Sequence, residues 1–327
     1  MKIAILDDYQ HVALKMADWS GIAKHHQIDV IDKPLVVPDQ AMRVLAPYDV
    51  ICMLRERTAA PRELLANLPN LRLLAITGQQ HRTLDLKAAT ERGILVCHSS
   101  AHAGAHQGTP ELAFALMLAA IRHIPLEDRA IREGRWQSSL GIQLYGRTLG
   151  LLGLGKIGRK VAKVAQAFEM NVIAWSQNLT AESAAEAGVK HVDKDELFRQ
   201  SDIVSLHLVL GERTLGIVGA QELSLMKSSA LIINTARGPL IDEESLIDTL
   251  KHRRIAGAGL DVYWQEPIPH DHPLLKMDNV VLTPHLGYVV EESYRAFYGD
   301  LVESVTAWLD GKPIRMSNPE VWKGGKT

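Results

Sequence analysis

The chain has few cysteines, few aromatic residues and almost no excess of charge. Each of these shortages argues against some classes of protein. Its 327 residues include two cysteines, 5% aromatic residues and a formal net charge of −2. Two thiols cannot build a disulfide scaffold, and the charge favours neither nucleic acid nor an anionic membrane as a partner. We interpret Cys52 and Cys97, which each follow an apolar run, as buried thiols in a reducing compartment. We therefore expect a cytoplasmic protein.

Long apolar runs are also missing. No uninterrupted run approaches the roughly 20 residues that a membrane-spanning helix needs. The N-terminal segment turns acidic at Asp7 after one short apolar run, so we interpret it as a first β-strand and not as a signal peptide. With 46% apolar and 23% charged residues, the composition is that of a globular protein, and the length favours two domains.

Short β-branched runs alternate with helical patterns along the whole chain, which predicts α/β architecture with parallel sheets. The predicted strands are residues 3–6, 49–53, 73–76, 94–97, 148–152, 171–175, 202–208, 230–234, 257–262 and 279–282. A loop at 99–108 separates the first four strands from the rest. Thr109 and Pro110 then open a helix, 112–122, that is apolar on nearly every side, which predicts burial, in part against another subunit.

The most informative motif is Gly153-Leu154-Gly155-Lys156-Ile157-Gly158. It follows a predicted strand, opens the amphipathic helix 159–168 and leads to a second strand, which is the context of a dinucleotide-binding turn. There the glycines allow a tight turn and close approach to a pyrophosphate at the helix N-terminus. NAD enzymes usually place an acid at the end of the second strand, but this chain has Ser176 there, with Arg159 as a possible neighbour. The preference between NAD and NADP is therefore open.

Three later strands are each followed by one polar residue in an apolar or turn-rich context: Arg237, Glu266 and His285. Taken singly, each is better explained as structural or solvent-exposed. Together they match the reduction of a keto acid, because His can supply a proton, a carboxylate can stabilise the imidazolium, and Arg can bind the substrate carboxylate. Side chains after consecutive strands of a dinucleotide-binding sheet are expected at its carboxyl edge, where ligands bind.

These motifs, in this order, resemble the D-isomer-specific 2-hydroxyacid dehydrogenase family. The similar segments run nearly end to end: 71–99, 145–176, 202–214, 231–246 and 256–287. The resemblance implies a Rossmann-type NAD(P)-binding domain, residues 101–288, inserted into a flavodoxin-like substrate domain, residues 1–100 plus 289–327. It also implies that the final helix, 291–309, returns to the first domain, and that substrate lies between the two domains.

By that resemblance, Arg237 binds the carboxylate and keto oxygen of the substrate, His285 is the acid/base, and Glu266 tunes His285. Substrate is also held by the backbone of a glycine loop that aligns with Gly78 and Gln79, although Gln80 and His81 depart from the family pattern. The residues implied in cofactor binding are Gly153, Gly155, Lys156, Ile157, Gly158, Ser176, Leu208, Thr235, Ala236, Arg237, Asp261, His285 and Gly287.

The predicted function is hydride transfer between NAD(P)H and a small 2-keto or 2-hydroxy acid, such as glyoxylate, hydroxypyruvate or a 3-phosphoglycerate-type substrate, by a homodimer. Two alternatives stay open: a non-catalytic NAD(H)-sensing protein on the same scaffold, and a dehydrogenase of formate- or phosphite-like substrates. His98, His102 and His106 recur every four residues, but no cysteine or acid completes a ligand set, so no metal is predicted.

Overall fold

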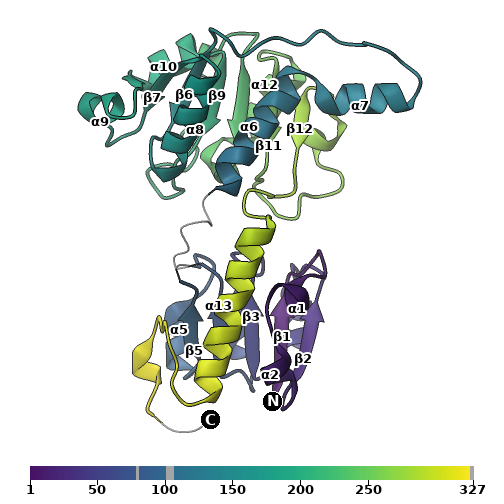
Figure 1. Cartoon of the computed structure of the whole chain (residues 1–327), viewed down its shortest axis with the longest axis vertical. Helices are drawn as coiled ribbons and strands as arrows, with labels where there is room; N and C mark the ends of the chain where they lie inside the picture. The colour runs from purple at the N-terminus through teal and green to yellow at the C-terminus, as the bar shows by residue number, and fades with distance from the viewer. Residues whose placement is uncertain (79–80, 101–106, 325–327) are drawn as a thin grey trace. The chain divides into compact units, whose positions relative to one another are not determined.

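The computed structural model describes residues 1–78, 81–100 and 107–324, and the chain divides into two compact units. Unit 1 comprises Met1–Ala105 and Val290–Thr327, and unit 2 comprises His106–Val289. The chain therefore leaves unit 1, builds unit 2 and returns (Figure 1). Gln79, a predicted substrate contact, and His102 and His106 of the histidine series lie outside the described residues.

Unit 1 is built on a five-stranded parallel sheet in the order β2-β1-β3-β4-β5, which is the strand order of the flavodoxin-like fold that the family resemblance implied. Its strands are β1 (Lys2–Leu6), β2 (Gln27–Ile31), β3 (Val50–Met53), β4 (Leu73–Ile76) and β5 (Leu95–His98). The three central strands are buried apart from Lys2 at the start of β1, and all three were predicted. Strand β2 was not, because it lies at the edge, is only partly buried and has no continuous apolar run.

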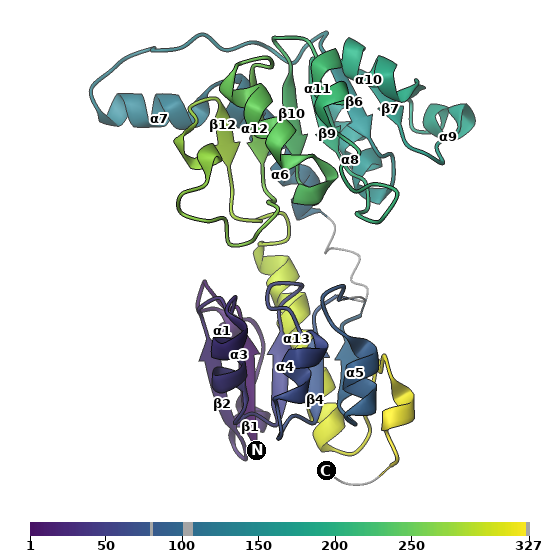
Figure 2. The ribbon, with the colours of Figure 1, turned by 180° about the vertical axis from the view of Figure 1, so that it is seen from behind.

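The helices of unit 1 cover both faces of this sheet (Figure 2). They are α1 (Ala13–Met16), α2 (Ser20–Ala23), α3 (Pro38–Leu45), α4 (Arg62–Ala66), α5 (Leu86–Glu91) and α13 (Glu291–Leu309), followed by the short helix η4 (Pro319–Val321). Helix α13 spans the predicted residues and contacts α1 and β4. Its Tyr298 and Trp308 are among the largest fully buried side chains.

Unit 2 is built on a seven-stranded parallel sheet in the order β12-β11-β10-β9-β6-β7-β8. The strands are β6 (Thr148–Leu152), β7 (Asn171–Trp175), β8 (Lys190–His191), β9 (Ile203–Leu206), β10 (Leu231–Asn234), β11 (Gly257–Leu260) and β12 (Val280–Leu282). The order reverses between β6 and β9, as in a Rossmann fold, so the crevice for a dinucleotide lies at the carboxyl ends of these two strands. The two-residue edge strand β8 was not predicted.

The helices of unit 2 are α6 (Gly108–Ile121), α7 (Ile124–Arg132), α8 (Lys156–Ala167), α9 (Ala181–Ala185), α10 (Lys194–Gln200), α11 (Ala220–Leu225) and α12 (Glu243–Lys251), with short helices η2 (Gly238–Leu240) and η3 (Pro273–Lys276). Helix α6 packs on β10, β11 and α8, so burial within unit 2 accounts for much of its apolar character. Helix α7 was not predicted. Figure 1 shows α7 and the extended segment after it projecting from the body of unit 2.

Both cysteines are buried, as expected, and burial raises the pKa of each thiol to about 12. Within the described ranges, no helix is both long and apolar enough to cross a membrane. In the same part of the chain, no group of three or more histidine, cysteine or acidic side chains could hold a metal ion.

Candidate active site

The glycine-rich turn joins β6 to α8, and each of its glycines has a different reason to be there. Gly153 has φ +108°, a left-handed conformation that favours glycine. A Cβ on Gly158 would lie 2.2 Å from the carbonyl oxygen of Gly153, so helix and strand meet too closely for any side chain. A Cβ on Gly155 would meet no atom within 4 Å, which leaves its backbone open to a ligand.

A pocket of about 650 Å³ lies beside this turn. It is lined by the turn, by the residues after β7 and by the loop after β9: Gly153, Leu154, Gly155, Ser176, Gln177, Asn178 and residues 207–214. Four of the predicted cofactor contacts, Gly153, Gly155, Ser176 and Leu208, thus line one pocket. A pocket of this size, with open glycine backbone at the N-terminus of α8, fits the adenosine and phosphate groups of a dinucleotide.

Sequence reasoning missed most of the loop after β9. The place of the loop in the sheet could have identified it. The loop follows β9, the strand next to β6, at the point where the strand order reverses and ligands bind. The ring of His207 lies within 2.9 Å of the Ser205 hydroxyl, and its burial lowers the pKa of His207 to about 4. At neutral pH this histidine is therefore an uncharged part of the pocket wall.

The position after β7 has no acid, and the nearby arginine has a structural partner. Ser176 and Gln177 line the pocket, and the Gln177 amide donates to the carbonyl oxygen of Arg213 at 3.0 Å. The guanidinium of Arg159, which the sequence offered as a neighbour of Ser176, donates instead to the carbonyl and hydroxyl oxygens of Ser183. Arg213, in the same pocket wall, is exposed.

The segment after β10 is a tight turn held by Asn234. Its side-chain amide donates to the Arg237 carbonyl at 2.9 Å, and its side-chain oxygen accepts from the Ala236 N–H at 3.0 Å. This places Arg237, which is half-buried, immediately beyond the carboxyl end of the strand. The hydroxyl of Thr235 is buried without a hydrogen-bond partner among the described residues. An unpaired buried hydroxyl beside Arg237 fits a site that a bound group completes.

The segments after β10 and β11 are packed directly on one another. A Cβ on Gly238 would lie 2.2 Å from the carbonyl carbon of Tyr263, so only glycine permits this approach. The Tyr263 N–H then donates to Glu266 Oε1 at 3.0 Å, which fixes the carboxylate. The loops that carry Arg237 and Glu266 are therefore adjacent.

His285 and Glu266 form the closest polar pair of the site. His285 Nδ1 lies 2.6 Å from Glu266 Oε2, and both side chains keep about a fifth to a quarter of their surface exposed. His285 has φ +56°, an uncommon conformation for a residue with a side chain. The contact with Glu266 at Nδ1 fixes the orientation of the imidazole ring.

Asp261 supports the turn that presents His285. Its buried carboxylate accepts from the Leu286 N–H at 2.6 Å, the Gly287 N–H at 2.9 Å and the Thr283 hydroxyl at 2.6 Å. Burial raises the pKa of Asp261, while these hydrogen bonds act in the opposite direction. The Thr109 hydroxyl of α6 donates to the Gly287 carbonyl at 2.9 Å. These contacts hold both flanks of His285 and stabilise its left-handed conformation.

In unit 1, Gly78 follows β4 with φ +93°. Its N–H donates to the Ser99 hydroxyl at 2.7 Å, so this amide already has a protein acceptor. His81, where the sequence departs from the family pattern, is buried, and that burial lowers its pKa.

The strand order and the glycine turn together define a dinucleotide-binding fold, and comparison with known proteins agrees with this fold. Residues 114–287 match the family model described as D-isomer specific 2-hydroxyacid dehydrogenase, NAD binding domain. The chain belongs to the D-isomer-specific 2-hydroxyacid dehydrogenase family.

Three relatives illustrate the similarity. A glyoxylate reductase of Korarchaeum cryptofilum is 39% identical over 80% of this chain and 80% of its own length. A D-3-phosphoglycerate dehydrogenase of Archaeoglobus fulgidus is 38% identical over 85% of this chain, which spans about half (52%) of that longer protein. A crystal structure of a phosphoglycerate oxidoreductase from Vibrio cholerae superposes with a TM-score of 0.88 at 35% identity, covering 94% of this chain and 98% of the other.

Proposed function

We propose that this chain reduces a small 2-keto acid to the D-2-hydroxy acid with a hydride from NAD(P)H. The observation that carries the proposal is the His285–Glu266 pair at 2.6 Å, on loops that follow neighbouring strands and lie beside the Arg237 turn. A histidine oriented by a carboxylate next to a guanidinium is the set of groups that carbonyl reduction needs.

In this mechanism each side chain has one task. Arg237 binds the substrate carboxylate and offsets the negative charge that develops on the keto oxygen. His285, protonated and held by Glu266 through Nδ1, gives the Nε2 proton to that oxygen. NAD(P)H, when bound, supplies the hydride to the carbonyl carbon. In the reverse direction, neutral His285 accepts the hydroxyl proton.

The cofactor is held by the glycine turn and by the pocket beside it. Gly153, Gly155, Lys156, Ile157 and Gly158 bind the pyrophosphate at the start of α8, while Ser176 and Leu208 contact the adenosine half. Further contacts near the nicotinamide come from Thr235, Ala236, Arg237, Asp261, His285 and Gly287; for Asp261 the contact is indirect, through the turn that it holds.

NADP is accepted as well as NAD. Ser176 carries no charge to repel a 2′-phosphate, and the exposed guanidinium of Arg213 in the same pocket wall is a cation that can bind one. The adjacent Glu212 also lines the pocket, so the preference depends on both side chains.

The active form is a homodimer. Residues 124–145 expose several large apolar side chains, including Trp136 (75% exposed) and Leu140 (91%), with Ile124, Ile131 and Tyr145. Such a set on α7 and the segment after it favours contact with another chain. This moves the expected interface from α6, which is largely buried, to α7 and the segment after it. A monomer in light scattering at micromolar concentration would contradict the dimer.

The decisive experiment is initial-rate oxidation of NADPH and NADH, in parallel, with glyoxylate, hydroxypyruvate, pyruvate and 3-phosphohydroxypyruvate. Turnover of one or more keto acids supports the proposal. Tight cofactor binding without turnover of any would favour the non-catalytic nucleotide sensor. Reduction of NAD(P)⁺ by formate or phosphite, and by no hydroxy acid, would favour the remaining alternative.

A further inference from the structure

The loop after β11 carries Glu266, and the rings of two other residues in this loop lie against each other. Trp264 precedes Glu266 by two residues, and His272 follows it by six. The centroids of the two rings are 6.3 Å apart and their planes differ by 9°, so the rings are stacked. Because the chain leaves at Trp264 and returns at His272, the stack closes the base of the segment in which Glu266 lies.

Both ring nitrogens of His272 have hydrogen-bond partners. Nδ1 accepts from the Leu274 N–H at 3.3 Å, so Nε2 carries the ring proton. Nε2 lies 2.9 Å from Glu243 Oε1 and donates to it. The side chain of His272 is only 10% exposed, whereas that of Glu243 is 40% exposed. The ring is therefore held at its edge by two hydrogen bonds and on its face by Trp264.

The partner of His272 belongs to the segment after β10. Glu243 is the first residue of α12 and follows Arg237 by six residues. Trp264 contacts the same segment, because its Nε1–H donates to the Ile241 carbonyl at 2.7 Å. The stacked rings are thus bonded at two points to the segment that begins with the Arg237 turn, in addition to the backbone packing described above.

These contacts fix the chain next to the Glu266 carboxylate. Trp264 directly follows Tyr263, whose N–H donates to Glu266 Oε1 at 3.0 Å. The other oxygen, Oε2, lies 2.6 Å from His285 Nδ1. Both carboxylate oxygens are engaged, so a movement of this loop would disturb at least one of the two contacts. A catalytic contact keeps its geometry only when the residues that support it are themselves fixed by packing and hydrogen bonds, and His272 supplies both.

We propose that His272 is a positioning residue for the Glu266–His285 pair. It acts through the loop and not through contact with the substrate. By holding the loop of Glu266 against the segment of Arg237, it keeps Glu266 within hydrogen-bond distance of His285 during proton transfer. The proposal rests on the function proposed above. A His272 with a purely structural role would change stability and leave the rate of the reaction unchanged.

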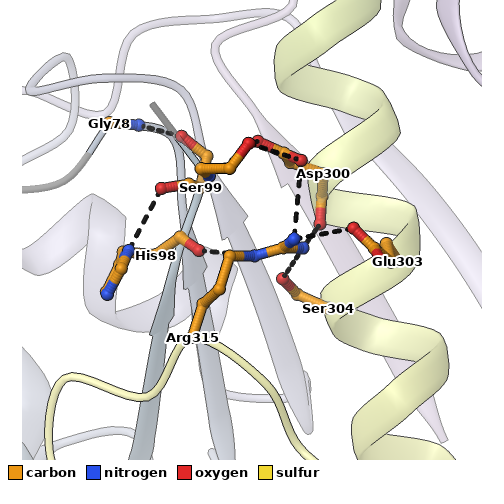
Figure 3. Close-up of polar contacts among 8 residues, drawn as sticks. Gly78, His98, Ser99, Asp300, Glu303, Ser304 and Arg315 are labelled. Atoms are coloured by element: carbon orange, nitrogen blue, oxygen red, sulfur yellow. Dashed lines mark hydrogen bonds and ion pairs between the residues drawn. The ribbon is translucent and has the colours of Figure 1, made fainter. Parts of the chain in front are cut away.

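The chain offers two control residues. His252 pairs with Asp248 at 2.9 Å, so it too contacts an acid of α12, but at the opposite end of that helix. Arg315, in unit 1, donates to the Glu303 carboxylate at 2.7 Å and to the His98 carbonyl at 3.2 Å, which joins α13 to the end of β5 (Figure 3). His252→Ala therefore tests the loss of a histidine–acid pair, and Arg315→Ala tests the loss of a polar cluster outside unit 2.

The test is a double-mutant cycle of His272→Ala and Glu266→Ala, measured as kcat for the keto acid that the wild type reduces fastest. His272→Ala should lower kcat by about ten- to a hundredfold, because small displacements of catalytic groups cost this much. In the Glu266→Ala background the same substitution should lower kcat by less than about threefold, because the contact that His272 protects is already gone. NADPH affinity, and the kcat of both control variants, should stay near those of the wild type.

A folded His272→Ala protein with the kcat of the wild type would overturn the proposal. An equal loss in both backgrounds would overturn it as well, because His272 would then not act through Glu266. So would a comparable loss of kcat in Arg315→Ala, because kcat would then follow stability alone.

If His272→Ala does not fold, Glu243→Ala decides, because it removes the hydrogen-bond acceptor and leaves the stacked rings in place. A fall in kcat that depends on Glu266 then supports the proposal, and an unchanged kcat overturns it. A wild-type protein that reduces no keto acid would instead contradict the proposed function, which separates the two failures.

Discussion

The two parallel sheets place different chemistry at their carboxyl edges. In unit 2 this edge holds an open glycine turn, a pocket and the partly exposed His285–Glu266 pair. In unit 1 the same edge holds polar side chains that are buried and already hydrogen-bonded, such as Asp7 to Thr58 and Ser99 to Gly78. The same parallel-sheet architecture therefore has a different role in each unit. The carboxyl edge in unit 2 exposes reactive side chains, and the carboxyl edge in unit 1 holds backbone segments in place. The following predictions test that division.

The largest effect is expected at the reactive edge. His285→Ala removes the proton donor, so kcat should fall by about 10²–10⁴-fold, the usual contribution of general acid catalysis. Cofactor affinity should stay near that of the wild type, measured by fluorescence titration of NADPH. Glu266→Gln keeps a side chain of the same size and should give a smaller loss. A His285→Ala enzyme with more than about a tenth of the wild-type kcat would remove His285 from the mechanism.

The next prediction separates two glycines of one turn. Gly158→Ala would put a Cβ 2.2 Å from the Gly153 carbonyl oxygen, so the variant should lose about 1–3 kcal/mol of stability or fail to fold. Gly155→Ala has free space, so it should fold like the wild type but bind NAD(P)H less tightly where the new methyl group meets the cofactor. Melting curves and dinucleotide titrations distinguish the two. Equal stability of both variants would contradict the packing argument.

Much of this site could be predicted from the sequence, because its signals are local. The glycine turn, Ser176 after β7, and Arg237, Glu266 and His285 after successive strands all follow strong apolar runs. Residues brought in by tertiary structure could not be predicted in this way. The loop 207–214 enters the pocket because the strand order puts β9 beside β6.

The same limit applies to the fold. The central strands were predicted because each contains a short, mainly apolar run, whereas β2 and β8 are edge strands with mixed patterns. The sequence also could not show that Arg159 contacts Ser183 or that the Asp261 carboxylate holds the turn of His285, because these partners are 22 to 26 residues apart.

A smaller effect is expected on cofactor choice. Ser176→Asp places a carboxylate where it can accept from a ribose 2′-hydroxyl and repel a 2′-phosphate, so the ratio of NADPH to NADH affinity should fall by at least about tenfold. Ser176→Asn is the matched control, because it has nearly the same shape without the charge. An unchanged ratio in the Asp variant would show that Ser176 does not face the ribose. Arg213→Ala should lower NADPH affinity alone if its guanidinium binds the phosphate.

The smallest effect concerns a buried acid at the edge of unit 1. Burial raises the pKa of Asp7 from 3.8 to about 6, against the hydrogen bonds from Thr58 and Tyr9 that favour the carboxylate. A carboxyl group whose pKa is higher in the folded state stabilises the fold at low pH, and this stabilisation is lost as pH rises from 3.8 through about 6.

Asp7→Asn, which mimics the protonated acid, should therefore gain stability relative to the wild type as pH rises. The difference in unfolding free energy should be under about 1 kcal/mol near pH 4 and reach up to about 3 kcal/mol at pH 7.5. Denaturant titrations of both proteins at these two pH values measure it. A difference that does not change with pH would mean that Asp7 ionises as easily in the folded chain as in the unfolded one. In that case the carboxyl edge of unit 1 would be open to water at Asp7, and the contrast with unit 2 would be weaker.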